Sequence, residues 1–144
     1  MRALSTDRKV AALATAPLFA GLGRREMRQL AQVAESVDVK PGKVLVREGK
    51  SATEFFVIVE GQFGVTRDGR TISELGPGDF FGEIALIESS RRSATVTAKT
   101  DGRLFVLTRR AFWDLLDSDR DVERRVLRAV AKRLLATVAD PTTP

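Results

Sequence analysis

One short apolar stretch of this chain, residues 80–96, contains a glycine, a carboxylate and two adjacent arginines. Gly82 has no side chain, so the backbone there can approach a ligand closely. Glu83–Leu86 is expected to form one turn of helix, whose start offers N–H donors and a partial positive charge. Arg92 then precedes an alternating segment, Ser93–Ala98, typical of a half-buried strand, where an arginine needs an anionic partner. These residue types predict a pocket for a small anion such as phosphate.

The stretch resembles the phosphate-binding cassette of the cyclic nucleotide-binding domain family. The family pattern is F-G-E-(I/L)-A-L, a short loop, and then P-R-x-A-(S/T)-V. It is met here by Phe81, Gly82, Glu83, Ile84, Ala85, Leu86, Arg92, Ala94, Thr95 and Val96. Arg91 stands where proline is usual, and proline there would stiffen the loop.

The resemblance implies a role for each matching residue. Arg92 would pair with the exocyclic oxygens of a cyclic phosphate, and the N–H groups of Ile84, Ala85 and Ser93 would share its negative charge. Glu83 would accept the proton of the ribose 2′-hydroxyl. The alternative is a surface ion pair between Glu83 and Arg92, worth about 0–1 kcal/mol. Agreement over the whole motif favours the pocket.

The end of the chain adds a candidate residue for the base. The segment AKRLLATV, residues 131–138, resembles the dimerisation helix of bacterial cAMP receptor proteins, in which a threonine reads the adenine amino group. Thr137 matches that threonine, although a threonine near a helix end is usually solvated or bonded to backbone. Ser93 follows the arginine as serine does in bacterial cAMP receptors, whereas cGMP-selective relatives often carry threonine there, and its hydroxyl could serve phosphate or guanine. The ligand that the resemblance implies is cAMP, with cGMP as the alternative. The expected ligand-binding residues are Gly82, Glu83, Ile84, Ala85, Arg92, Ser93, Thr95 and Thr137.

The elements that must position these residues are mainly strands. Turn signals at Pro41-Gly42, Asp68-Gly69 and residues 76–79 separate short apolar or alternating runs, of which Glu54–Glu60 is the densest. Short strands separated by turns predict an all-β barrel or sandwich. The fold expected from the resemblance is a β-jelly-roll barrel with N-terminal helices and two C-terminal helices, a mainly β class with flanking α-helices.

Two helices are predicted after the strand Arg103–Thr108. Thr108 is expected to cap the first helix, and Asp117, Ser118 and Asp119 to end it and cap the second. The second is predicted over Val122–Val138, with an apolar band wider than one packed side requires. This band indicates a lid over the ligand's base or a contact in a homodimer.

The chain of 144 residues is expected to form one cyclic nucleotide-binding domain. Its predicted parts are a helical lead-in (1–35), the barrel (36–108) with the cassette (80–96), the C-terminal helices (109–138) and a tail (139–144). Basic residues before an apolar run and Ala-Thr-Ala at 14–16 also resemble a signal peptide. The helical pattern that continues through LFAGLGRREMRQLA resembles the family's lead-in and favours the first interpretation.

Composition excludes several functions. The chain has no Cys and no His, which removes thiol nucleophiles, His-based triads and the usual zinc sites and argues against the metal-binding cupins. No metal, cofactor or catalytic residue is therefore expected, and the chain is not expected to be an enzyme. No apolar run of membrane-spanning length is present, so no membrane contact is expected and the cytoplasm is the predicted location.

The net charge of +5 does not predict nucleic-acid binding. The excess positive charge lies on the helical flanks, whereas residues 41–108 carry equal numbers of basic and acidic side chains. No helix-turn-helix follows the last helix, so direct DNA binding is not expected.

Two hypotheses follow from these patterns. The first is a cyclic nucleotide sensor whose C-terminal helix moves when ligand binds and whose effector the sequence does not identify. The second is an interaction or oligomerisation domain that keeps the fold without binding nucleotide, with Arg91 marking the divergence.

Overall fold

The computed structural model describes the backbone of residues 4–139 and the side chains of residues 4–136. Helices come first: α1 (Thr6–Leu13), the 3-10 turn η1 (Pro17–Phe19) and α2 (Arg24–Val33). The strands and one short helix follow: β1 (Glu35–Val39), β2 (Val44–Val46), β3 (Glu54–Glu60), β4 (Phe63–Arg67), β5 (Arg70–Leu75), β6 (Phe80–Phe81), α3 (Glu83–Ile87), β7 (Thr95–Ala98) and β8 (Gly102–Thr108). Two helices complete the described chain: α4 (Arg109–Ser118) and α5 (Arg120–Ala139).

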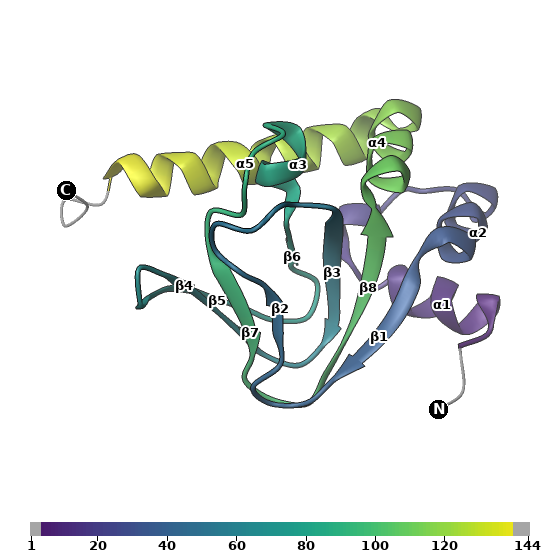
Figure 1. The fold of residues 1–144 in the computed structure, drawn as a ribbon. Coiled ribbons are helices and arrows are strands. Elements are labelled where there is room, and N and C mark those ends of the chain that lie inside the picture. Colours follow the sequence, from purple (N-terminus) through teal and green to yellow (C-terminus); the bar gives the residue numbers. More distant parts are fainter. Residues whose placement is uncertain (1–3, 140–144) are drawn as a thin grey trace.

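The strands form two four-stranded antiparallel sheets (Figure 1). One has the order β1-β8-β3-β6 and the other the order β2-β7-β4-β5. Consecutive strands such as β7 and β8 therefore belong to different sheets. The sheets are not closed into one barrel, so the expected jelly roll takes the form of a sandwich. The predicted class, mainly β with flanking helices, is confirmed.

Strand β3 explains how two cores are built. Its side chains alternate, so Phe56 and Ile58 face the other sheet while Phe55 and Val57 face the helices. The same alternation occurs in β8, where Leu104 and Val106 pack between the sheets and Phe105 and Leu107 pack against the helices. Helices cover the outer face of this sheet, so β3 is buried on both faces. A strand buried on both faces needs apolar residues at nearly every position, which explains the continuous apolar run in the sequence of β3.

The C-terminal helices begin where their capping residues predict. The Thr108 hydroxyl accepts a hydrogen bond from the Ala111 N–H at 3.1 Å, and an Asp119 carboxylate oxygen accepts one from the Val122 N–H at 2.9 Å. These contacts confirm both predicted caps. Helix α5 begins two residues before the predicted start at Val122.

The N-terminal segment that resembled a signal peptide contributes to the helical core. Leu13, Ala16, Leu18 and Phe19 are each at most 2% exposed. They pack with the outward-facing side chains of β3 and β8. Among the described residues, no helix has the length and apolar character needed to cross a membrane.

Candidate functional site

Gly82 occupies a backbone conformation that other residues adopt only with strain. Its φ is +96°, in the left-handed region, and it directly precedes α3. A Cβ at this position would lie 2.7 Å from a guanidinium nitrogen of Arg92 and 3.0 Å from the Glu54 carbonyl oxygen. The absence of a side chain therefore allows the turn and also the close approach of Arg92.

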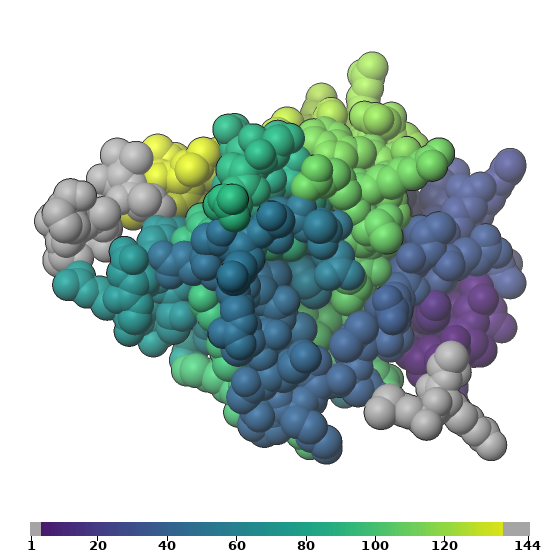
Figure 2. All heavy atoms as spheres, in the orientation of Figure 1, coloured from purple at the N-terminus to yellow at the C-terminus, as the bar shows by residue number. Residues whose placement is uncertain are grey.

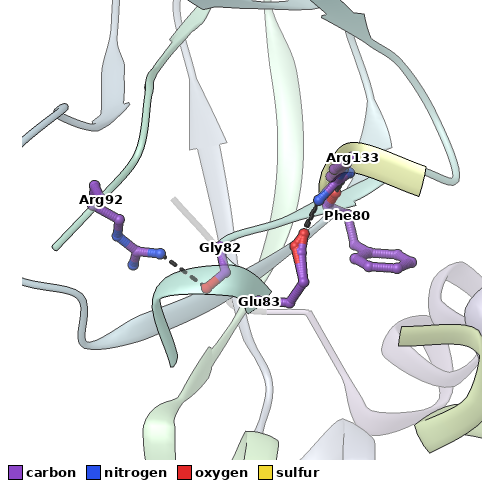
Figure 3. Close-up of polar contacts among 5 residues, drawn as sticks. All are labelled: Phe80, Gly82, Glu83, Arg92 and Arg133. Atoms are coloured by element: carbon purple, nitrogen blue, oxygen red, sulfur yellow. Dashed lines mark hydrogen bonds and ion pairs between the residues drawn. The ribbon is translucent and has the colours of Figure 1, made fainter. Parts of the chain in front are cut away.

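Arg92 brings a buried positive charge to the same place. It is 7% exposed, and its side chain donates hydrogen bonds to the carbonyl oxygen of Gly82, at 3.1 Å (Figure 3), and to that of Glu54, at 2.6 Å. Burial lowers the pKa of this guanidinium; the Glu54 carboxylate opposes the shift and the Arg109 cation adds to it. Within the described residues no carboxylate bonds to Arg92. A buried cation bonded only to neutral oxygens favours binding of an anion.

Glu83 is paired with an arginine that the sequence analysis did not single out. Its carboxylate is 1% exposed and forms an ion pair with Arg133 of α5, whose Nη1 lies 2.6 Å from Oε2 (Figure 3). Arg133 also donates to the Phe80 carbonyl oxygen and lies over the Phe80 ring. Burial lowers the pKa of Arg133, and Asp79 opposes that shift. The alternative pairing of Glu83 with Arg92 is therefore wrong.

One feature of the sequence could have pointed to Arg133. Val122, Val126 and Val130 follow one another at intervals of four residues, and the first two are fully buried. Arg133 continues that face three residues later, so it lies on the side of α5 that packs against the domain. What it contacts depends on the path of α5 across the strands, which its own helical pattern does not specify.

Six of the predicted ligand-binding residues of the cassette line one cavity of about 770 Å³. Cassette residues among its lining are Gly82, Glu83, Ile84, Ala85, Arg92 and Ser93. The β4–β5 hairpin contributes Arg67, Asp68, Arg70, Ile72 and Ser73, and α5 contributes Arg133, Leu134 and Ala136. The hairpin, in teal, and the end of α5, in yellow, lie at the same end of the molecule (Figure 2). The cavity thus combines arginine side chains, two carboxylates (Asp68 and Glu83) and apolar side chains.

One predicted site residue, Thr95, does not line this cavity, and another, Thr137, lies beyond the described side chains. Thr95 is absent from its lining, and its hydroxyl accepts a hydrogen bond from the Glu48 N–H at 3.0 Å. On β7 the inward side chains are Val96 and Ala98, so Thr95 faces the other way. Thr137 belongs to α5, but its side chain lies outside the part of the chain that the structure describes.

Comparison with known proteins is consistent with this site. A family model described as "Cyclic nucleotide-binding domain" matches residues 36–119. A cAMP-dependent protein kinase regulatory subunit from Yarrowia lipolytica is 36% identical over 102 residues, which are 69% of this chain and 27% of that protein. The chain spans about a quarter to a third of the length of the first curated relatives that it matches.

Solved structures share the fold over most of this chain. Cyclic AMP-bound PfPKA-R superposes with a TM-score of 0.81 at 25% identity, covering 95% of this chain and 49% of that one. A cAMP-binding acyltransferase from Mycobacterium smegmatis superposes with a TM-score of 0.75 at 32% identity, covering 92% of this chain and 42% of that one. In both cases the similarity covers about half of the other chain or less.

Proposed function

This chain belongs to the cyclic nucleotide-binding domain family, and we propose that it binds cAMP and acts as a sensor module for a separate effector. The observation that carries the proposal is Arg92, a buried cation at the wall of a nucleotide-sized cavity, whose side chain, among the described residues, hydrogen-bonds only carbonyl oxygens. The cAMP-bound PfPKA-R and the cAMP-binding acyltransferase support the ligand class.

The cyclic phosphate would bind at Arg92 and the start of α3. A guanidinium has five N–H donors, and the contacts with Gly82 and Glu54 use two of them. Donors therefore remain for the exocyclic oxygens. The N–H groups of Ile84, Ala85 and Ser93, all from cavity-lining residues, would share the negative charge.

The ribose would bind at Glu83. A carboxylate has about four acceptor positions, so one can accept the 2′-hydroxyl while Arg133 keeps its own contacts. Arg133 would hold the carboxylate in the orientation that the hydroxyl needs. We expect this pair to make the site selective for ribonucleotides over 2′-deoxyribonucleotides.

The base would lie between the β4–β5 hairpin and the end of α5. Leu134 lines the cavity yet is 52% exposed, which suits a side chain that covers a bound base. Thr137 stays a candidate for reading adenine, and Ser93 for reading guanine or assisting the phosphate. Thr95 would support the cassette strand through its bond with Glu48.

The output would pass through α5. Arg133 connects this helix to the cassette, so a ligand that binds better when both are closed would shift the population toward the docked helix. The chain itself would supply no catalysis, and any regulated chemistry would lie on an effector. The cytoplasmic location stays a prediction from the sequence.

The second candidate is a nucleotide-independent interaction domain, favoured by the exposure of apolar side chains on α5. Leu127, Leu134 and Leu135 are 51–66% exposed, as expected for a helix that contacts a second copy. A thermal melt separates the two functions. A melting temperature that rises with millimolar cAMP supports the sensor. An unchanged melt together with a dimer on gel filtration supports the second candidate.

A further inference from the structure

The backbone that carries Arg92 is held by the loop between β2 and β3. The Arg92 N–H donates to the Lys50 carbonyl oxygen at 2.8 Å, and the Gly49 N–H donates to the Arg92 carbonyl oxygen at 2.9 Å. Ser51 and Arg91 form an antiparallel bridge beside these bonds. The position of the Arg92 backbone therefore depends on where residues 49–51 lie.

The Arg91 side chain adds a further connection to the same loop. Its Nη1 donates to the Gly49 carbonyl oxygen at 3.0 Å. Gly49 is thus contacted on both of its peptide groups, through its N–H by Arg92 and through its carbonyl by Arg91. Arg91 is exposed and is not among the residues that line the cavity, so its contribution is to the loop and not to a ligand.

We propose that Arg91 is a positioning residue for the anion site: its hydrogen bond to Gly49 fixes the β2–β3 loop against the cassette and thereby presets Arg92. Family members usually have proline at this position, which would restrict the loop covalently. Here the hydrogen bond from Arg91 to the β2–β3 loop would restrict the cassette loop instead, through a contact with another part of the chain. The consequence for affinity rests on the proposed function, whereas the consequence for loop order does not.

Amide hydrogen exchange without nucleotide tests the loop directly. Arg91→Met removes the donors and keeps much of the stem. Loss of this exposed hydrogen bond should make exchange at the Gly49 and Arg92 amides about fivefold faster, since a tenfold change corresponds to about 1.4 kcal/mol. Arg91→Lys, which keeps a donor and the charge, should fall between wild type and Arg91→Met.

Titration with cAMP then tests the consequence for the site. Arg91→Met should bind cAMP about fivefold more weakly than wild type. The control is Arg110→Met, because Arg110 is also exposed and, among the described residues, its side chain makes no hydrogen bond or ion pair. This variant should leave exchange and affinity unchanged, which excludes a general effect of charge.

The possible results separate this proposal from the proposed function. Faster exchange at both amides together with weaker cAMP binding supports both the role of Arg91 and the sensor function. Faster exchange in a protein that does not bind any cyclic nucleotide supports the role in loop order and contradicts the sensor function. Unchanged exchange in Arg91→Met overturns the role of Arg91, whatever its affinity. Equal loss in Arg91→Met and Arg91→Lys contradicts a role for the donated hydrogen bond.

Discussion

Arg133→Met should destabilise the protein in the absence of any nucleotide. The variant leaves the Glu83 carboxylate, 1% exposed, without its ion-pair partner. Removing one member of a fully buried pair costs about 3–5 kcal/mol. The Arg133 side chain is 33% exposed, so water screens part of the interaction. We therefore expect the free energy of unfolding to fall by about 2–3 kcal/mol.

Urea unfolding followed by fluorescence measures this loss. Trp113 is the single tryptophan of the chain; it is partly exposed but packs edge-on against Phe112, which belongs to the helical core, so its emission should report the transition. Arg128→Met is the matched control, because Arg128 is an exposed arginine of the same helix. Its effect should stay within about 0.5 kcal/mol.

A double-mutant cycle isolates the contact with Glu83 from the other contacts of Arg133. In a Glu83→Gln background the buried charge is absent, so adding Arg133→Met should cost about 1 kcal/mol or less. The coupling between the two positions should therefore be at least about 1 kcal/mol. The same cost in both backgrounds, or a cost below about 0.5 kcal/mol in the wild-type background, would refute the assignment of Arg133 as the partner that stabilises Glu83.

Three further predictions concern the turn, a surface pair and α5. Gly82→Ala, which strains a residue at φ +96° and crowds Arg92, should cost about 1–3 kcal/mol in urea unfolding and weaken cAMP binding; unchanged values of both would contradict the role of this turn. A hydrogen bond from Arg103 lowers the pKa of Asp38. The pair should therefore add about 0.5 kcal/mol to the free energy of unfolding at pH values above about 3.9, the pKa of Asp38 in the unfolded state. This contribution should be lost as the pH falls through the lower pKa of Asp38 in the folded state. Asp38→Asn should remove this pH dependence, and an identical acid unfolding profile would argue against the pair. If α5 forms a dimer contact, Leu134→Gln should shift sedimentation from dimer toward monomer with little change in stability, and an unchanged dimer would exclude Leu134 from the contact.

Local patterns in the sequence were sufficient to predict the short helix and the strand of the cassette. The residues after Gly82 form the expected helical turn and the segment after Arg92 alternates, so both predictions depend on neighbours within a few positions. The caps at Thr108 and Asp119 are local in the same way, because each side chain bonds an N–H only three residues later. Local hydrogen-bonding chemistry and strand periodicity specify such features directly.

Contacts between distant segments could not be read in the same way. The partner of Glu83 comes from α5, fifty residues later, and depends on how that helix crosses the domain. Strand β1 was not predicted: Glu35–Val39 has only two apolar residues, Val37 and Val39, and its pairing with β8 arises only in the folded sheet. The bond between the Thr95 hydroxyl and Glu48 likewise joins segments 47 residues apart.

The central claim is that Arg92 binds the phosphate of a cyclic nucleotide, and calorimetric titration with cAMP and cGMP tests it most directly. We predict saturable binding by the wild-type protein. Arg92→Ala should lose about 3–5 kcal/mol of binding free energy, a reduction of more than about a hundredfold. Arg110→Ala should bind as the wild type does. Equal binding of cAMP by wild type and a folded Arg92→Ala variant would contradict the claim.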